Sequence, residues 1–499
     1  MRGFWYQWHV LLLPLDGAGP LHRQLYRSLR SAILSGRLRG GARLPSTRSL
    51  ARELGLSRNT VLAACEQLAA EGYAAPRARS GLFVAESLPA RGAPEAARTA
   101  RARPRATAPA LSDTGKRMAS AVAPGRATWS PWQKPLPYDF RYGEPNYAGL
   151  PLETWARLLG RRARRLSARR LAYQAPGGAA ELREALCGYL GRARGVACSA
   201  EQIVVVHGSQ QALDLVTRLF VDPGARVVLE EPGYTGFTLC AKAAGAELVY
   251  VRVDEQGLCT DELARVSDAK LAFVTPSHQY PAGGVLSLPR RLALLEWAAR
   301  AGAYVIEDDY DGEFRFDARP IECLQALDRD GRVIYVGTAS KLLFPALRIG
   351  WIVAPEPTAA LLQNAKALAD TGTPSLEQLA LADFIAEGHL ERHARRARAR
   401  TAVLRAALLA AVDDELGARA RVRGASAGLH VLLELPQVDA RRTSRLREEC
   451  RRRGVGVYSA APFYARPPSR VELLLGYASL DEKKIREGVR RLRRALDAL

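Results

Sequence analysis

One lysine in this chain stands where covalent chemistry is favoured. Lys341 follows the apolar run 333–336 and the small residues 337–340. A lysine held in a partly dry pocket at a strand end loses part of its preference for the proton, and its amine can then form a Schiff base with an aldehyde. Arg348 follows at a spacing that suits a phosphate on the same ligand, which a guanidinium fork binds bidentately. A surface lysine after a strand is the plainer interpretation, but it leaves the polar residues described next unexplained.

The elements that must position this lysine are apolar runs that alternate with helical segments. Six runs are nearly uniformly apolar, which is typical of a mostly parallel sheet covered by helices on both faces. Ligands of such α/β sheets bind at the carboxyl ends of the strands. The runs are residues 203–206, 227–229, 248–251, 271–274, 304–306 and 333–336.

Polar residues follow several of these runs directly. Ser209 and Gln210 open a helix after the first run, where backbone amides and the helix dipole suit a phosphate. Tyr234 comes after the second run and can lay its ring on a flat heterocycle, although a core tyrosine is the more common role. Asp308 ends the fifth run, and a buried carboxylate there needs a cation, such as a protonated pyridine nitrogen. The hydroxyl of Tyr310 can reach a ring oxygen.

Together the lysine, guanidinium, carboxylate, aromatic ring and phosphate turn describe a site for pyridoxal 5′-phosphate (PLP). The order of these motifs between Tyr138 and Leu499 resembles the fold-type I aminotransferases. The resemblance implies that Lys341 forms the Schiff base with PLP, Asp308 pairs with the pyridine nitrogen, and Tyr310 contacts the ring hydroxyl. Whether His278 or Gln279 makes a further polar contact stays open. The remaining implied contacts are ring stacking by Tyr234 and a phosphate held among Ser209, Gln210, Thr338, Ser340 and Arg348.

The last motif of the chain departs from the aminotransferase pattern. In many members of that family an arginine in this motif holds the carboxylate of the substrate, and Leu474 stands in its place here. Without that arginine, a charge-assisted clamp on ordinary amino acids is lost. The departure favours a sensing role over catalysis, unless another arginine substitutes.

The N-terminal part predicts a small helical head. Apolar residues recur at helical spacing over 20–36, and Ser46 and Ser57 are suitable N-caps for a second and a third helix. Two short helices joined at Gly55 form a helix-turn-helix, whose second helix enters the major groove of DNA. The segment 74–84 predicts a two-stranded wing. An ordinary three-helix head with a charged surface is the alternative.

Residues 44–73, LPSTRSLARELGLSRNTVLAACEQLAAEGY, resemble the winged-helix DNA-binding domain of GntR-type bacterial regulators. The wing of that family usually contains Gly-Ser-Gly, and Arg79 replaces its first glycine here. The resemblance implies DNA contacts from the two helices and the wing, namely from Arg48, Ser57, Arg58, Asn59, Thr60 and Gly81.

The chain divides by pattern into an arm, a head, a linker and a large domain. An apolar N-terminal arm at 1–19 precedes the winged-helix domain at 20–86. Residues 87–137 are rich in proline, alanine and arginine and have little apolar bulk, so they predict a flexible linker. The aminotransferase-like PLP-binding domain spans 138–499, with a large part at about 138–373 and a small part at about 374–499.

Composition narrows the class of partner and the compartment. The 499-residue chain has a formal net charge of +22, which favours an anionic partner such as nucleic acid, although arginine is spread along the whole chain. Its seven cysteines show no CxxC pair, so we expect free thiols in a reducing cytoplasm and no metal site. The apolar run 10–13 is too short to span a bilayer, and neither a signal peptide nor a membrane anchor is expected.

The order of winged helix, linker and aminotransferase-like domain resembles the MocR subgroup of the GntR family. The resemblance implies a transcriptional regulator that binds a double-stranded DNA operator and senses PLP or an amino compound. Genes of vitamin B6, amine or amino-acid metabolism are the implied targets. It also implies a homodimer in which the head of one chain packs against the large domain of the other, a head-to-tail domain exchange. An active PLP-dependent aminotransferase with an auxiliary DNA-binding head is the alternative, and residual transaminase activity stays open.

Overall fold

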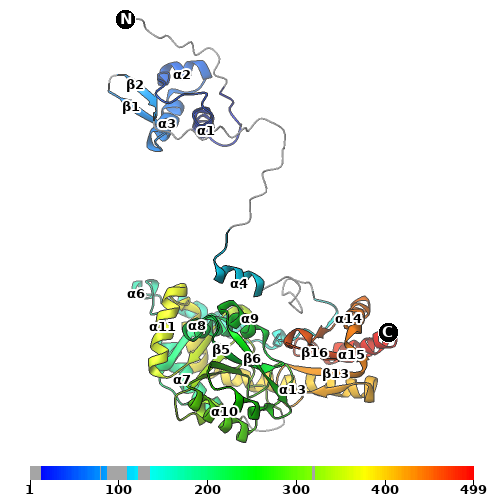
Figure 1. Ribbon diagram of the computed structural model, residues 1–499. Coiled ribbons are helices and arrows are strands. Elements are labelled where there is room, and N and C mark those ends of the chain that lie inside the picture. Colours follow the sequence, from blue (N-terminus) through cyan, green and yellow to red (C-terminus); the bar gives the residue numbers. More distant parts are fainter. Residues whose placement is uncertain (1–12, 79, 87–109, 122–134, 317–320) are drawn as a thin grey trace. The chain divides into compact units, whose positions relative to one another are not determined.

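The computed structural model describes residues 13–78, 80–86, 110–121, 135–316 and 321–499 of the chain. The chain divides into two compact units, Met1–Pro109 and Ala110–Leu499, which are considered separately (Figure 1). Outside the described residues lie most of the predicted N-terminal arm, Arg79 of the wing and the linker stretches 87–109 and 122–134.

The first unit is a bundle of three short helices with one hairpin. Leu25 and Leu29 on one helix pack with Val61 and Leu68 on another, and all four side chains are almost fully buried. This small aliphatic core is what the helical spacing of leucines in the sequence predicts. The elements are α1 (Leu21–Leu34), α2 (Thr47–Leu54), α3 (Arg58–Ala70) and the antiparallel strands β1 (Ala74–Arg77) and β2 (Gly81–Val84).

Side-chain caps start both helices of the helix-turn-helix. Ser46 Oγ accepts a hydrogen bond from the Ser49 amide at 3.1 Å, and Ser57 Oγ accepts one from the Thr60 amide at 3.1 Å. Gly55 ends α2 in the left-handed conformation with φ of 65°, so the chain turns at once into the next helix. The predicted winged helix-turn-helix is therefore confirmed.

An eight-stranded mixed sheet forms the centre of the second unit, in the order β4-β11-β10-β9-β8-β5-β6-β7. Strands β10, β9, β8, β5 and β6 pair in parallel, whereas β11 runs antiparallel between β4 and β10. The sequence runs predicted the parallel strands but not β11. The strands are β4 (Ile203–Val206), β5 (Arg226–Glu231), β6 (Glu247–Asp254), β7 (Gly257–Leu258), β8 (Ala269–Val274), β9 (Tyr304–Asp309), β10 (Val333–Thr338) and β11 (Gly350–Val353).

Helices cover both faces of this sheet, as the uniformly apolar strands predict. Val204 and Val206 of β4 belong to the core beneath α8, α9 and α11, whereas Val205 belongs to the core beneath α7 and α12. The α/β fold expected from the sequence is thus confirmed. The helices are α5 (Leu152–Ala163), α6 (Ala168–Leu171), α7 (Ala180–Arg194), α8 (Ser209–Phe220), α9 (Thr235–Ala244), α10 (Leu288–Ala301), α11 (Glu356–Asp370) and α12 (Ser375–Ala386).

A smaller lobe is built on a four-stranded sheet with the order β12-β13-β16-β15. It also includes the start of the unit, because β3 pairs with β14 and Phe140 is fully buried in the core of this lobe. The lobe therefore takes residues from both ends of the predicted 138–499 domain. Its elements are β3 (Tyr138–Asp139), β12 (Arg421–Arg423), β13 (His430–Asp439), β14 (Val455–Gly456), β15 (Tyr458–Ser459), β16 (Arg470–Gly476), α14 (Thr443–Arg452) and α15 (Glu482–Leu496).

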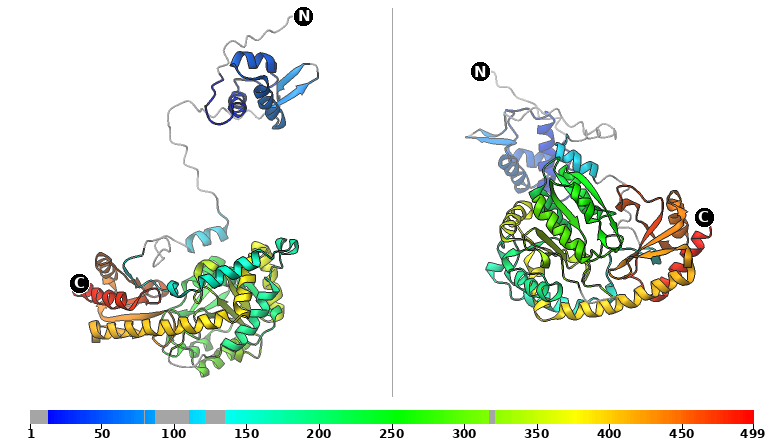
Figure 2. Two further views of the ribbon diagram at one scale, coloured as in Figure 1. Left: turned by 180° about the vertical axis from the view of Figure 1, so that it is seen from behind. Right: turned by 60° about the horizontal axis from the view of Figure 1, so that its bottom comes forward.

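One long helix, α13 (His389–Leu416), joins the two lobes. Its first turn contributes Leu390 to the core beneath the large sheet, and Leu404 and Leu416 lie in the core of the small lobe. Figure 2 shows this helix in yellow, running from the large lobe to the small one. Both hydrophobic cores therefore share one continuous helix.

A further helix, α4 (Asp113–Ala121), lies within the stretch that the sequence predicts as linker. It packs against α9, where Arg117 Nε donates to the Ala243 carbonyl at 3.1 Å, and Ala121 is buried. Ser112 starts it by accepting a hydrogen bond from the Gly115 amide at 3.1 Å. The expectation of a linker without structure is thus wrong for these residues, because a cap and a docking face outweigh the poor apolar content.

Two further searches covered only the part of the chain that the structure describes. Within it, no helix is long and apolar enough to cross a bilayer. The described residues also contain no group of His, Cys, Asp and Glu side chains that could hold a metal ion.

Candidate functional site

Lys341 lies just past the carboxyl end of β10, and it is half-buried. Its Nζ donates a hydrogen bond to the Gly143 carbonyl at 2.8 Å. Desolvation lowers the pKa of this amine, against the opposing attraction of the carboxylates of Asp311, Asp308 and Glu144. The sequence predicted such a partly dry lysine but gave no sign of its Gly143 partner, which lies far upstream in the chain.

Asp308 lies beside Lys341 because β9 and β10 run in parallel register, with Asp308 opposite Val336. Only 4% of Asp308 is exposed, and its Oδ1 has no hydrogen-bond partner among the described residues. Burial, and then the neighbouring Asp309, raise its pKa to about 7. A buried acceptor of this kind fits a protonated ring nitrogen, which would supply both a donor and a positive charge.

The adjacent carboxylate has a different environment. Asp309 points to the other face of β9, where Arg194 Nε donates to its Oδ2 at 2.6 Å and the Tyr335 hydroxyl at 2.7 Å. This buried, hydrogen-bonded ion pair accounts for Asp309 as a structural residue. Of the two consecutive acids in the motif, only Asp308 is left for a ligand.

The predicted phosphate residues come from two strands that β11 separates. Thr338 pairs with Gly350, which pairs with Val206, so the carboxyl ends of β10 and β4 lie side by side. A side chain at Gly350 would meet the backbone of Gly208 at 2.9 Å, so only glycine allows this close approach. Sequence reasoning missed β11 and with it the need for Gly350.

The guanidinium of Arg348 lies beside the adjacent carboxyl ends of β10 and β4. Its Nη2 donates to the His207 carbonyl at 2.6 Å, and it lies about 3 Å from where a Cβ on Gly208 would be. Ser209 starts α8 here, so the guanidinium and the free amides of a helix N-terminus occupy one place. Arg348 itself has a φ of 53°, an uncommon left-handed conformation for a non-glycine residue.

The other predicted phosphate contacts are less uniform. Thr338 Oγ1 donates to Ser340 Oγ at 3.0 Å and accepts from the Ser340 amide at 3.2 Å, so both residues form one buried turn beside Lys341. Gln210, in contrast, directs its side-chain amide to the Gly236 carbonyl at 3.1 Å. The structure thus brings the backbone of Gln210 to the carboxyl ends of β10 and β4 but commits its side chain to α9.

An aromatic cluster forms the next wall. The Tyr234 ring lies 6.2 Å from Phe273 in a stacked arrangement and 5.6 Å from Tyr280 edge-on. Tyr280 in turn meets Tyr310 at 5.7 Å. Burial raises the pKa of Tyr234, so its hydroxyl stays neutral. The ring of Tyr234 is therefore part of an aromatic cluster with Phe273 and Tyr280, and nothing in the sequence singled out Tyr280.

Tyr310 is held by a buried network that the sequence only partly indicated. Its hydroxyl lies 2.9 Å from His278 Nδ1, which is itself 2.9 Å from Asp311 Oδ2. Gln279 Nε2 instead donates to the Pro232 carbonyl at 2.8 Å. His278 is thus the one that reaches the predicted ring residues. Asp311 was missed, although it directly follows Tyr310 in the acidic stretch 307–311.

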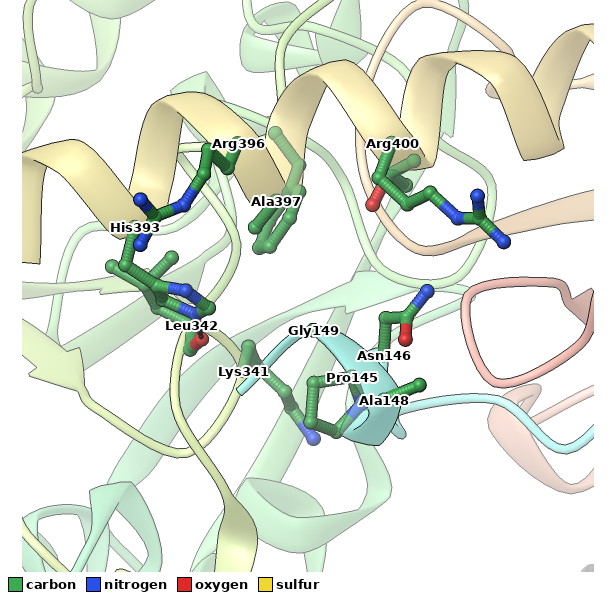
Figure 3. A pocket seen from close by; sticks show the side chains of 12 residues that line it. Pro145, Asn146, Ala148, Gly149, Lys341, Leu342, His393, Arg396, Ala397 and Arg400 are labelled. Carbon is green, nitrogen blue, oxygen red and sulfur yellow. Dashed lines mark hydrogen bonds between the residues drawn. The ribbon is translucent and has the colours of Figure 1, made fainter. Parts of the chain in front are cut away.

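A cavity of about 410 Å³ lies next to Lys341. Figure 3 shows Arg396 and Arg400 on α13 across this cavity from Lys341 and Asn146, with the lysine amine pointing away from the helix. His393 on the same helix anchors that side through its Nε2, 2.8 Å from the Leu342 carbonyl. The full lining is Pro145, Asn146, Ala148, Gly149, Phe314, Lys341, Leu342, His393, Arg396, Ala397, Arg400 and Thr401.

Leu474, in the place where an arginine was sought, is fully buried on β16. It pairs with Leu432 across the small sheet and packs with Tyr280 and Phe463. The position is filled by apolar and aromatic side chains, so it presents no charge to the carboxylate of a ligand.

The predicted DNA-contact residues lie on α2, at the start of α3 and at the start of β2. Arg48, Arg58 and Asn59 are exposed, and Ser57 and Thr60 use their side chains in the cap of α3. Gly81 begins β2 with a φ of 105°. Sequence reasoning missed a further basic residue, Arg43, whose guanidinium lies against Gly81.

Comparisons with known proteins match both units. Residues 139–492 match the family "Aminotransferase class I and II", and residues 21–84 match "Bacterial regulatory proteins, gntR family". The chain is 40% identical to the "Probable rhizopine catabolism regulatory protein MocR" of Rhizobium meliloti, over 98% of this chain and 96% of that protein.

A second relative and a solved structure extend these matches. The chain is 31% identical to the "HTH-type pyridoxine biosynthesis transcriptional regulator PdxR" of Corynebacterium glutamicum, over 93% of each chain. The structure is similar to LysN, an alpha-aminoadipate aminotransferase of Thermus thermophilus crystallised with N-(5′-phosphopyridoxyl)-L-leucine. That similarity has a TM-score of 0.67 and 32% identity, and it covers 72% of this chain and 92% of LysN.

Proposed function

The chain belongs to the MocR-type regulators of the GntR family, and from this premise we propose that it controls transcription in response to PLP or an amino compound bound at Lys341. The observation that carries the proposal is that Lys341, a partly dry amine, lies near Asp308, a buried acceptor whose Oδ1 has no partner among the described residues. A domain that only needed to fold would gain stability by replacing both groups.

The described residues fit PLP group by group. Asp308 would accept a hydrogen bond from the ring nitrogen, Tyr310 would contact the ring hydroxyl, and Tyr234 would cover one ring face. The N-terminus of α8, together with the Thr338–Ser340 turn and Arg348, would hold the phosphate. When bound, the cofactor supplies an aldehyde carbon that reacts with amines. Lys341 holds the amine that competes for that carbon, with its proton affinity reduced by burial.

The first unit supplies the output. Arg58 and Asn59 open the recognition helix, where they can reach base edges, and Arg48 and Arg43 can reach phosphates on either side. The partner is a double-stranded DNA operator. Such a regulator acts in the bacterial cytoplasm.

A homodimer is part of the proposal, and exposed apolar side chains of the second unit support it. Leu171, Tyr173 and Leu368 are 73%, 93% and 86% exposed, although all three are large and apolar or aromatic. Gly372, just past the end of α11, lies next to the backbone of residues 174–175, which brings the segments that bear Leu368 and Tyr173 near each other. A second copy of the chain would cover this patch. Packing of each head on the partner's large domain is part of the same proposal.

Genes of amine, amino-acid or vitamin B6 metabolism are the proposed targets. The support is the names of two relatives, one a rhizopine catabolism regulator and one a pyridoxine biosynthesis regulator. A catalytic role as an aminotransferase has less support, because Leu474 fills the position expected for a substrate clamp.

A mobility-shift titration tests the proposed function. Full-length protein is titrated on DNA from upstream of its own coding region, with and without PLP. We expect PLP to change the affinity or the footprint, and we expect the Lys341→Ala variant to bind DNA without responding to PLP. Identical affinity and footprint in both conditions, or steady transamination by protein that binds no DNA specifically, would contradict the proposal.

A further inference from the structure

The charges around Lys341 favour an amine and disfavour a second acid. Asp311, Asp308 and Glu144 all attract the lysine amine, whereas Arg348 is the cation that opposes it. Arg348 lies over Gly208 at the start of α8, the place that suits a phosphate. Once a phosphate uses this guanidinium, the charge left near the reactive amine is negative.

The wall formed by the apolar and aromatic cluster that packs against Tyr234 and Tyr310 carries no charge. Tyr142 directly precedes Gly143, the partner of the lysine amine, and its ring meets Phe463 at 5.9 Å. Tyr280 meets Phe463 at 5.2 Å, and behind them lie Leu432 and Leu474, both fully buried. A carboxylate pressed against this wall would lose its water without gaining a cation.

Arg141, the basic residue nearest to Gly143 along the chain, already forms ion pairs with carboxylates. Arg141 is 7% exposed, with its Nη2 at 3.1 Å from Asp139 Oδ2 and its Nη1 at 3.9 Å from Glu144 Oε1. The Tyr458 hydroxyl also donates to Asp139, at 2.5 Å. Arg141 therefore serves this carboxylate network and is not a spare anchor for an acidic ligand.

The same wall offers neutral hydrogen-bonding groups. His430, whose ring lies 5.3 Å from Tyr280, is 2% exposed, and its Nε2 has no partner among the described residues. Burial lowers the pKa of this imidazole well below its usual value, so it is uncharged. The hydroxyls of Tyr142 and Tyr280 already hydrogen-bond each other, and each keeps a further lone pair that, like the uncharged nitrogen of His430, can accept from a ligand hydroxyl.

We propose that the effector read at Lys341 is a small amino alcohol, a primary amine whose remaining surface is neutral and hydroxylated, rather than an amino acid. This inference rests on the proposed function, because it concerns the amine that competes with Lys341 for bound PLP. The amine end is favoured by Asp311 and Glu144, and the hydroxyl end by His430 and the tyrosines.

The cavity beside α13 offers guanidinium groups to an acid, because Arg396 and Arg400 line it together with Lys341. Lys341, however, turns its amine toward Gly143 and away from that helix (Figure 3). An acid held by these arginines is therefore the competing outcome that the experiment must detect.

Three probes with one carbon skeleton test the proposal. Full-length protein loaded with PLP is titrated at constant ionic strength with serinol (2-amino-1,3-propanediol), L-serine and 2-aminopropane. The readouts are the absorption band of the bound cofactor and DNA affinity in a mobility-shift assay. We expect the apparent Kd for serinol to be about ten-fold or more below that for L-serine, and several-fold below that for 2-aminopropane.

Variants test whether the preference for serinol over L-serine arises from the wall. Leu474→Arg should shift the preference toward L-serine, and the volume-matched Leu474→Met should leave it unchanged. The Arg396→Ala/Arg400→Ala double variant should respond to serinol like the parent protein. The comparison of probes in the parent protein needs no variant, so a poorly folded Leu474→Arg does not weaken the test.

Three results would overturn the inference. These are tighter binding of L-serine than of serinol by the parent protein, a serine preference that disappears in the Arg396→Ala/Arg400→Ala variant, and 2-aminopropane binding at least as tightly as serinol. A preparation that forms no cofactor band at all would instead overturn the proposed function, so the two failures are distinguishable.

Discussion

The candidate DNA-binding site and the candidate cofactor site differ most in the solvent exposure of their charged side chains. In the head, the side chains of Arg48, Arg58 and Asn59 are exposed. At the carboxyl edge of the large sheet, Asp308 and Asp311 are 4% and 2% exposed, and the lysine beside them has a lowered pKa. The charges of the head are solvated in the absence of DNA, whereas the ionisable groups around Lys341 are buried.

The difference predicts how each site responds to mutation. Solvated contacts contribute modest and nearly independent increments to DNA affinity. Buried charges are coupled to one another and to folding, so a single change there has larger effects, and the effects on stability and on binding can have opposite signs. The following predictions are arranged from the largest expected effect to the smallest.

Replacing Lys341 should abolish PLP attachment at one site and leave DNA affinity at the other unchanged. The Lys341→Ala variant should lose covalent attachment completely, so borohydride treatment with PLP should leave no mass increase on the protein. The matched variant Lys270→Ala changes an exposed lysine and should be labelled like the parent protein. DNA affinity without PLP should be the same for both. Labelling of Lys341→Ala at another lysine would show that the site has been assigned wrongly.

Replacing Asp308 should stabilise the cofactor-free protein while weakening PLP binding. Its folded pKa of about 7 is raised above the unfolded value of about 3.8, so stability is lost as pH rises between these values. Asp308→Asn removes this loss, and its advantage in urea unfolding should be about 2–4 kcal/mol at pH 8 and should vanish toward pH 4. PLP affinity should fall by about ten-fold or more, since a neutral amide replaces the partner of the ring nitrogen.

The adjacent acid is the control for that prediction. Asp309→Asn makes the same chemical change but leaves Arg194 buried without its charged partner. This variant should be less stable than the parent protein by about 3 kcal/mol at pH 8. Two neighbouring substitutions with the same sign would contradict the assignment of one carboxylate to the ligand and the other to the fold. Glu230 and Glu307, whose pKa values burial also raises to about 7, add a pH dependence of the same sign. Asp309→Asn should reduce the part due to Glu307, because the charge of Asp309 is one of the causes that raise the pKa of Glu307.

Replacing Arg58 should weaken specific DNA binding and leave the cofactor site untouched. Truncation of one base-contacting arginine costs about 1–3 kcal/mol, or about 5- to 150-fold in Kd, in a mobility-shift assay at fixed salt. The control Arg23→Ala removes an exposed arginine of α1 and should change affinity only slightly. Spectra of bound PLP should be identical in all three proteins. An equal loss for Arg23→Ala would point to nonspecific charge and not to readout by α3.

Removing the cap of α3 is the smallest of these changes. Ser57→Ala deletes the acceptor for the Thr60 amide and should cost about 1 kcal/mol of local stability. Amides of α3 should then exchange with deuterium about five-fold faster, with no change in the second unit. Ser80→Ala, at an exposed position of the hairpin turn, is the matched control and should not alter exchange.

The sequence alone predicts the head better than the cofactor site. The caps and the turn of the helix-turn-helix depend on contacts within a few residues of Ser46, Gly55 and Ser57. Local sequence therefore predicts both helix starts and the turn between them. Lys341 and Asp308 were predicted because each ends an apolar strand. Their pairing needed only the rule that parallel strands present their carboxyl ends at one edge.

What the sequence could not predict depends on contacts between distant residues. Gly143 binds the Lys341 amine across nearly two hundred positions, and Gly350 matters only because β11 passes between β4 and β10. The His278–Asp311 pair requires two loops to meet. Helix α4 was not predicted. Its capping residue, Ser112, is a weak helix signal in a stretch rich in proline, alanine and arginine.

The helix that bridges the two lobes has a mechanical consequence. With 28 residues, α13 is about 42 Å long, and it is held at one end by His393 on the residue after the reactive lysine. Its far end is embedded in the small lobe through Leu404 and Leu416. A tilt of about 5° at the anchored end would swing the other end by about 4 Å over that length. The helix can thus act as a lever arm that converts a small adjustment beside Lys341 into a displacement of several ångströms at the small lobe.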